Sequence, residues 1–298
     1  MQNKPAVYFL FLINKKSGAN NAPDWENLLK EKLAKPSFPY QILYLPASFE
    51  PEEIESKVKE INPAVLVAAG GDGTVALAAS IVAHTGIKLG IIPQGSANGM
   101  AKELGIPADV DEALDILLQQ HCAPCDLIKI NNIGYCMHMA DAGLNARLIK
   151  YFDEGNLRGM MGYAKVIVKT MFHQRKMNLQ LTTAEGTVTK NAFMVALANA
   201  SKYGTGAVLN PEGVVHDGYF EVVIVKHLHF ASLLRMLLKP GLFNPEKIEI
   251  FKVKKVEINS KHAMHFQVDG EYKGKVKKVS ASILPSAMQV IIAENENV

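Results

Sequence analysis

The stretch Ala64–Val75, AVLVAAGGDGTV, constrains the fold of this chain more than any other. Ala64–Ala69 contains no polar residue and no alternation, which is typical of a parallel strand covered on both faces. The glycines at 70, 71 and 73 then allow positive φ and a close approach of the backbone to a ligand. Because Thr74–Ala83 has the pattern of a helix, the turn would present backbone N–H groups at a helix N-terminus, where they suit an anion such as phosphate.

Asp72 stands out in this turn, because a carboxylate beside bound phosphates repels them unless a divalent cation or a substrate hydroxyl lies between. The alternative is an ordinary strand-to-helix turn with Asp72 as the N-cap. The GGDGT loop also resembles the nucleotide loop shared by diacylglycerol kinases, sphingosine kinases, NAD kinases and phosphofructokinases. This resemblance implies phosphoryl transfer and leaves the acceptor open.

The first third of the chain alternates short apolar runs with helical stretches, which predicts a parallel sheet with helices on both faces. The expected strands are Ala6–Ile13, Tyr40–Leu45, Ala64–Ala69 and Lys88–Ile92, and the expected helices are near Asp24–Ala34, Pro51–Ile61, Thr74–Ala83 and Ala97–Leu104. Ligands of such sheets bind outside the carboxyl ends of the strands. Three polar turns follow strands at that edge: NKKSG (14–18), GGDGT (70–74) and PQGSAN (93–98). Neither a Walker A pattern nor a GxGxxG fingerprint is present.

From about Asn131 the pattern changes to short strands of an antiparallel sheet, which predicts a second, mainly β domain. The expected strands are Tyr135–Met139, Asn178–Thr182, Ala192–Ala198, Tyr219–Val225, Lys254–Ile258 and His265–Val268. The last apolar run, Met288–Ala293, would be a further strand. Two helical stretches, Met160–Phe172 and Phe230–Leu238, interrupt them. Core or domain-packing helices are favoured over membrane elements for both.

Composition excludes several classes of protein. A chain of 298 residues is long for one core, and 48% hydrophobic with 20% charged residues is ordinary for a soluble enzyme. The formal net charge of +3 does not indicate nucleic-acid binding. No apolar run approaches the ~18 residues of a membrane span, and Ala6–Ile13 fits a first buried strand better than a signal core. We therefore expect a cytoplasmic protein.

The three cysteines do not form a disulfide framework. Cys122 and Cys125 make a lone CxxC with His121, Cys136 and His138 nearby. A single pair without a second pair at zinc-finger spacing is weak evidence for metal or redox chemistry, and the sequence does not decide whether these cysteines bind anything.

A specific resemblance comes from several segments together. GIIPQGSANGMAKELGIP (90–107) is similar to the second nucleotide-site segment of the bacterial diacylglycerol kinase-like lipid kinases, PxGTxNDFAR followed by LGIP. NKKSG and GGDGT precede it at the expected spacing. CDLIK, NASKYGTGAVLNP with the later Asp217–Gly218 pair, and QVDGE resemble further segments of that family. The resemblance implies a nucleotide domain at 1–130, a mainly β lipid-acceptor domain at 131–284, and a return of 285–298 to the first domain.

Phosphoryl transfer needs phosphates held in place, charge neutralised by a metal, and an acceptor hydroxyl relieved of its proton. We expect Asp72 and Asp126 to hold Mg²⁺, directly or through its waters. Glu271 is the candidate general base, and by resemblance Asp269 orients it. The alternative for this DGE segment is a hairpin turn with a solvated acid. ATP would be bound by the three turns, through Asn14, Gly18, Gly70, Gly71, Asp72, Gly73, Thr74, Gly95, Ser96 and Asn98.

The family also carries a structural magnesium in its β domain. The resemblance places it at Val214, Asp217 and Tyr219, bound by one carboxylate and by backbone carbonyls. The alternative is that Asp217 and Gly218 form only a tight turn.

The chain departs from the family pattern at four positions. Ala76 and Leu77 replace an Asn and a Glu after GGDGT, Ser96 replaces a Thr, and Gly99 replaces an Asp. The leading hypothesis is that the protein is an ATP-dependent kinase that phosphorylates a primary hydroxyl of a lipid, foremost diacylglycerol. A sphingoid or other lipid kinase, an NAD kinase and a catalytically silent nucleotide- or lipid-binding regulator are the alternatives.

A lipid acceptor would require the enzyme to visit a membrane surface, since exposing each methylene to water costs about 0.8 kcal/mol. We expect peripheral attachment at the inner face of the membrane. The candidate contacts are Lys252, Lys254, Lys255, Lys275, Lys277 and Lys278. Solvation of the strands by these lysines is the alternative, and a homodimer is left open.

Overall fold

A computed structural model describes residues 8–17, 23–34, 38–154, 176–201, 210–211, 213–226 and 248–294. The described residues belong to two compact units, whose limits along the chain are Met1–Cys125 with Ser286–Val298 for the first and Asp126–Pro285 for the second. Three sequence-based expectations lie outside the described residues: Gly18 and the helices at Met160–Phe172 and Phe230–Leu238.

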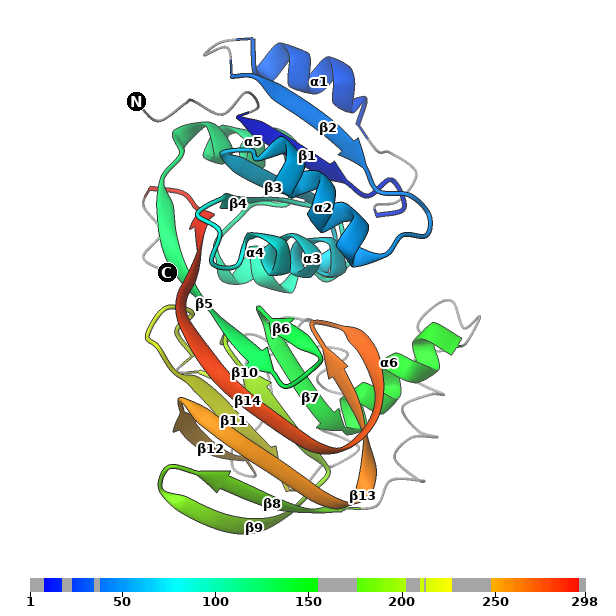
Figure 1. The fold of residues 1–298 in the computed structure, drawn as a ribbon, viewed down its shortest axis with the longest axis vertical. Coiled ribbons are helices and arrows are strands. Elements are labelled where there is room, and N and C mark those ends of the chain that lie inside the picture. Colours follow the sequence, from blue (N-terminus) through cyan, green and yellow to red (C-terminus); the bar gives the residue numbers. More distant parts are fainter. Residues whose placement is uncertain are drawn as a thin grey trace. The chain divides into compact units, whose positions relative to one another are not determined.

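The first unit is built on a parallel sheet (Figure 1), whose strands follow the order β4-β3-β1-β2. Its strands are β1 (Phe9–Ile13), β2 (Tyr40–Tyr44), β3 (Val65–Gly70) and β4 (Lys88–Pro93). Its helices are α1 (Trp25–Lys32), α2 (Pro51–Ile61), α3 (Asp72–Val82), α4 (Gly99–Glu103) and α5 (Val110–Gln119). Every residue of β1 and β3 is buried, as expected for parallel strands without alternation. The C-terminal part of β14 (Glu271–Ile291) joins this sheet, with Val290 paired in parallel to Leu89.

The second unit is mainly antiparallel, with a sheet path β12-β11-β10-β7-β13-β14 and a β8–β9 hairpin paired to β13. Its strands are β5 (Cys122–Ile130), β6 (Gly134–Cys136), β7 (Met139–Gly143), β8 (Met177–Thr183), β9 (Gly186–Ala192), β10 (Met194–Ala198), β11 (Phe220–Val225), β12 (Ile248–Val253) and β13 (Lys255–Val268). Helix α6 (Leu144–Glu154) packs against β7 and β13. The core of this unit contains Phe220, Val222, Phe266 and Val268, all buried.

The expected fold class is confirmed: a parallel α/β unit is followed by a mainly antiparallel β unit. The bounds differ in two instructive places. The strand expected at Tyr135–Met139 is divided into β6 and β7. The two strands expected between Lys254 and Val268 form one strand, β13, whose register shifts between Asn259 and Met264. A bulge of this kind inserts extra residues without ending a strand, so the apolar pattern breaks while the pairing resumes.

The sequence patterns did not predict α5, α6, β5, β9 and β12, and of β14 they predicted only the end, within Met288–Ala293. Strand β9 is almost entirely exposed, and its sequence, GTVTKNA, has no apolar face that would signal a strand. Strand β12 lies at the end of the sheet path and its residues are only partly buried or exposed. The conformation of β9 is decided by its pairing with β8, which local composition does not show, whereas the β-branched and aromatic residues of IEIFKV do favour the strand β12.

Candidate active site

The loop after β1 forms one side of a three-loop cluster in the first unit. The side chain of Asn14 accepts a hydrogen bond from Lys16 N at 3.0 Å, which closes an Asx turn. The Asn14 side chain also donates to Thr74 Oγ1 at 3.4 Å, and Ser17 Oγ accepts from Gly71 N at 3.3 Å. The loop at 14–17 is therefore tied to the GGDGT loop by side chains.

The GGDGT loop joins β3 directly to α3. Gly71 is the N-cap and Asp72 is the first helical residue, so the alternative interpretation of Asp72 as the N-cap is wrong. A Cβ at Gly70 would lie 2.3 Å from Thr74 Oγ1, and the Thr74 side chain is buried. Only a glycine allows the strand to turn this closely into the helix.

The PQGSAN loop packs its backbone against the backbone of GGDGT. A Cβ at Gly95 would lie 2.6 Å from Gly71 Cα, and Gln94 N donates to Gly70 O at 2.8 Å. Asn98 has φ of 49° and closes its own turn with two 2.8 Å bonds: Gly95 N donates to Asn98 Oδ1, and Asn98 Nδ2 donates to Gly95 O. Ser96 is exposed at the tip. The loops after β3 and β4 thus form a cradle of small residues that a phosphate chain can approach.

Asp72 links the same two loops through its carboxylate. Oδ1 accepts a hydrogen bond from Gly99 N at 2.7 Å, and no hydrogen-bond partner of Oδ2 is found among the described residues. The side chain is partly exposed. A carboxylate that has one oxygen available beside a phosphate cradle is a ligand of the kind that Mg²⁺ prefers.

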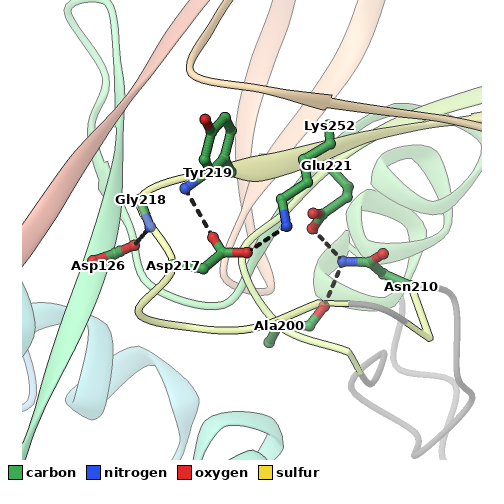
Figure 2. Close-up of polar contacts among 8 residues, drawn as sticks. All are labelled: Asp126, Ala200, Asn210, Asp217, Gly218, Tyr219, Glu221 and Lys252. Atoms are coloured by element: carbon green, nitrogen blue, oxygen red, sulfur yellow. Dashed lines mark hydrogen bonds and ion pairs between the residues drawn. The ribbon is translucent and has the colours of Figure 1, made fainter.

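Asp126 belongs to the second unit, in contrast to Asp72. Its carboxylate is fully buried, and Oδ2 accepts a hydrogen bond from Gly218 N at 2.7 Å (Figure 2). Its backbone N donates to Val215 O at 2.7 Å, and Asn199 Nδ2 donates to its carbonyl at 2.9 Å. Asp126 therefore holds the loop before β11 through its bonds to Gly218 and Val215.

The loop expected to hold a second magnesium is organised around an ion pair. Asp217 Oδ1 accepts from Tyr219 N at 2.9 Å, and Asp217 Oδ2 lies 2.6 Å from Lys252 Nζ (Figure 2). Gly218 has φ of 75°, so the tight turn considered as the alternative is present. The Asp217 carboxylate raises the pKa of Lys252, which keeps the ammonium charged.

This donor set does not fit magnesium in its present arrangement. Both Asp217 oxygens already accept from N–H donors, and one of those donors carries a positive charge. A divalent cation would have to displace the Lys252 ammonium before it could bind the carboxylate. Among the described residues, no group of three or more His, Cys, Asp or Glu side chains is arranged to hold a metal. Cys122, Cys125 and Cys136 are free thiols.

The DGE segment forms the tight hairpin between β13 and β14. Val268 pairs with Glu271, and Asp269 and Gly270 have φ of 47° and 87°, as in a two-residue type I′ turn. The Asp269 carboxylate does not contact Glu271 in any described bond. It accepts backbone N–H bonds of 2.8 to 3.0 Å from Met137, His138 and Met139.

Glu271 itself is exposed at the start of β14. Its Oε2 lies 2.8 Å from Lys273 Nζ, and 56% of its side chain is accessible. An acceptor hydroxyl can therefore reach this carboxylate. Nearby, burial and the Asp269 charge raise the pKa of Cys136 well above its usual range, so that the thiol stays protonated and donates to Asp269 Oδ1 at 3.3 Å. Cys136 is a buried donor in this arrangement, not a nucleophile.

Comparisons with known proteins match both units. The family described as the diacylglycerol kinase catalytic domain matches residues 8–130. The family described as the YegS C-terminal NAD kinase beta sandwich-like domain matches residues 138–292, over half of the chain. The chain belongs to the diacylglycerol kinase-like lipid kinase family.

Individual relatives agree with this assignment. A diacylglycerol kinase of Staphylococcus aureus (strain bovine RF122 / ET3-1) is 30% identical over 72% of this chain and 70% of its own length. The Serratia proteamaculans protein named "Probable lipid kinase YegS-like" is 26% identical over 98% of this chain and 96% of its own. A crystal structure of a diacylglycerol kinase from Bacillus anthracis has a TM-score of 0.75 at 20% identity, covering 96% of this chain and 97% of that one, and shows the same fold.

As a member of this lipid kinase family, the chain is a phosphotransferase with an alcohol group as acceptor. None of the helices in the described part of the chain is both long and apolar enough to cross a bilayer.

Sequence reasoning missed several residues that shape the two site regions of this lipid kinase. Ser17 lies inside the NKKSG motif, and its hydroxyl could have been considered with Asn14. Gln267 lies inside the QVDGE segment, where the sequence alone does not indicate its role. Asp141 is a single carboxylate within the otherwise apolar strand MADAG, and that isolation was the signal.

Proposed function

We propose that this protein is an ATP-dependent lipid kinase that transfers the γ-phosphate to a primary hydroxyl, foremost that of diacylglycerol. The observation that carries the proposal is the glycine cradle of the first unit, in which a Cβ at Gly95 would lie 2.6 Å from Gly71 Cα. Kinases act chiefly by positioning phosphates and neutralising their charge, and small residues at the start of a helix let phosphates approach the N–H groups of its first turn. Relatives named diacylglycerol kinase support diacylglycerol as the first acceptor to test.

The residues of the chain would divide the work as follows. Gly70, Gly71, Gly73 and Gly95 would let the backbone approach the phosphates, with Asn14 and Ser96 supplying polar side chains, Thr74 and Asn98 holding the loops together, and Gly18 as a further candidate. Asp72 would hold Mg²⁺ through its second oxygen, with Asp126 as the further candidate. Bound magnesium would neutralise the charge of the phosphates. Glu271 would accept the proton of the acceptor hydroxyl.

One assay tests the function and its alternatives together. Labelled ATP and Mg²⁺ are supplied with diacylglycerol, a sphingoid base and other lipids in mixed micelles, and with NAD in a separate reaction. We expect label in phosphatidic acid, the product from diacylglycerol. Label in another lipid or in NAD would redirect the assignment, and no labelled product would favour the silent regulator.

Asp72→Asn tests the metal assignment in the same assay. The neutral amide compensates a cation poorly, so turnover should fall and the magnesium dependence should shift to higher concentration. A magnesium titration that overlays the wild type would remove Asp72 from the metal site.

We also propose that the exposed face of the β13–β14 hairpin attaches the enzyme to the inner face of the membrane. Lys255, Lys275 and Lys277 are exposed on these strands. The other candidates have partners: Lys252 pairs with Asp217, Lys278 with Glu257 at 2.7 Å, and Lys254 lies over the Tyr219 ring. We therefore assign the attachment to Lys255, Lys275 and Lys277, each of which would contribute up to about 1 kcal/mol of binding free energy near an anionic surface.

Sedimentation with vesicles tests this attachment. The wild type should bind phosphatidylserine-containing vesicles at low salt, and it should be released as salt shortens the Debye length to roughly 3 Å at 1 M. Lys275→Gln with Lys277→Gln should weaken binding, whereas Lys30→Gln with Lys57→Gln, at exposed positions of the first unit, should not. Equal sedimentation with neutral and anionic vesicles at every salt concentration would refute the membrane face and leave the kinase assignment intact.

A further inference from the structure

A buried carboxylate in the second unit has no place in the proposed chemistry. Asp141 lies in β7 with no exposed surface. Its Oδ1 accepts from Ala146 N at 3.0 Å, and its Oδ2 accepts from Asn145 Nδ2 at 2.7 Å and from Gln267 Nε2. Burying a carboxylate is costly unless donors surround it, so this position must satisfy a structural or functional requirement.

Gln267 connects this carboxylate to the hairpin turn. It lies directly opposite Asp141 in the β13–β7 pairing and only 2% of it is exposed. Its Nε2 donates to Asp141 Oδ2 and, at 3.4 Å, to Met139 O, and its Oε1 accepts from Gly270 N at 2.8 Å. Because the Asp141 carboxylate and the Met139 carbonyl both accept from the amide nitrogen, they fix which end of the amide faces them. The amide oxygen is therefore turned toward Gly270.

The bond to Gly270 matters because of the geometry of the turn. Val268 and Glu271 are the paired residues that flank the turn, so Gly270 N–H lies outside the strand pairing. Gln267 Oε1 satisfies that N–H from one side of the turn. On the other side the Asp269 carboxylate is held by the three backbone N–H groups at 137–139. The residue that follows this doubly held turn is Glu271.

We propose that Gln267 is a positioning residue for Glu271. The buried Asp141 carboxylate holds the amide nitrogen of Gln267, so that the amide oxygen accepts from Gly270 N and fixes the turn that precedes Glu271. The proposal rests on the proposed function, in which Glu271 is the general base. Gln267 contacts neither the substrate nor the reacting atoms in this account. Its effect is on the direction in which the turn presents Glu271, and misplacement of a reacting group by about 1 Å costs up to 10²-fold in rate.

Reversing the polarity of the pair provides a test. Gln267→Glu places a second carboxylate against Asp141 and should lower kcat roughly tenfold to a hundredfold, with the KM for ATP unchanged. Adding Asp141→Asn supplies an amide N–H that can donate to one oxygen of the new carboxylate at position 267. The other oxygen of that carboxylate still accepts from Gly270 N. The double variant Asp141→Asn with Gln267→Glu should recover most of the lost kcat.

Two further variants separate positioning from folding. Gln267→Met keeps the volume and removes the three side-chain hydrogen bonds, so kcat should fall and the Gly270 amide should exchange with deuterium about tenfold faster in the full chain. Gln180→Glu, at an exposed position of β8, is the matched charge control and should change neither quantity. Melting temperatures identify any variant that fails to fold.

The outcomes are distinguishable. Normal kcat in Gln267→Met, or a double variant no better than Gln267→Glu alone, would overturn the proposal. If the wild type phosphorylates no lipid, the proposed function fails, and the exchange rate of the Gly270 amide in Gln267→Met still shows whether Gln267 holds the turn.

Discussion

The candidate site region of the first unit is formed by closely packed backbone, whereas that of the second unit is held by buried polar side chains. In the first unit, the loops after β3 and β4 meet backbone to backbone at Gly71 and Gly95, and the polar side chains there close short turns. In the second unit, the DGE turn is held by buried side chains, Asp269 and Gln267, that bond to backbone groups. Asp269 reaches residues 130 to 132 positions earlier in the chain.

The difference teaches where each kind of site is vulnerable. A backbone cradle is sensitive to the addition of a single carbon, because no side chain can move aside to admit it. A turn anchored by buried carboxylates is sensitive to the loss of one oxygen, because the N–H groups facing it are left without an acceptor. Of the four predictions that follow, Gly95→Ala and Asp269→Asn test these two vulnerabilities directly, and the other two concern charged groups of the second unit.

The largest effect is expected at the exposed acid of the DGE turn. Glu271→Gln should lower kcat by about 10²- to 10⁴-fold and leave the KM for ATP nearly unchanged, because it removes a proton acceptor and no phosphate contact. Steady-state kinetics with diacylglycerol measures both constants. Lys273→Met, which removes the partner of Glu271, is the control and should cost little. Near-normal turnover in Glu271→Gln would remove Glu271 from the mechanism.

Asp269→Asn should destabilise the second unit by about 3 kcal/mol, since an amide offers one acceptor oxygen where the carboxylate has two and turns N–H donors toward the N–H groups at 137–139. Urea unfolding followed by circular dichroism measures the loss. The exposed neighbour Glu271→Gln should change stability by less than about 0.5 kcal/mol. Equal stability of the two variants would mean that side-chain anchoring does not hold this turn.

Gly95→Ala tests the backbone cradle, because the added Cβ would lie 2.6 Å from Gly71 Cα and 2.8 Å from Asn98 Oδ1. The loops must separate, and the KM for ATP should rise by about tenfold, or about 1.4 kcal/mol. Gly71→Ala gives a graded comparison: its nearest contact would be 3.2 Å, and its effect should be smaller. An unchanged KM in Gly95→Ala would show that close packing of these loops is not needed for ATP binding.

The smallest effect concerns the loop around Asp217. With Lys252 paired to its carboxylate, the wild type without nucleotide should melt at the same temperature in Mg²⁺ and in EDTA. Lys252→Met removes the competing ammonium, and Mg²⁺ should then raise Tm by a few degrees. Lys254→Met, which contacts the same Tyr219 ring, is the control. A wild-type Tm that rises with Mg²⁺ would favour the magnesium site expected from the family resemblance.

Parts of the fold followed directly from the sequence because they depend on local physics. Strands β1 and β3 are uninterrupted apolar runs, β4 is apolar after Lys88, and helix α2 has the bounds expected from Pro51 and its amphipathic pattern. The exposed strand β9 could not be foreseen, since its residues carry no apolar face and its pairing with β8 decides its conformation.

The sequence by itself determined the α/β unit, the three loops at the carboxyl ends of its strands, and the family, because glycine spacing and apolar runs act over a few residues. Only the tertiary structure decided which partners the polar and charged side chains of the second unit bind. Asp269 binds the backbone at 137–139, Gln267 bridges Asp141 to Gly270, and Lys252 occupies the Asp217 carboxylate. Each of these pairings joins residues far apart in the chain, and the need to satisfy a buried or charged group becomes visible only when the fold has placed its partner beside it.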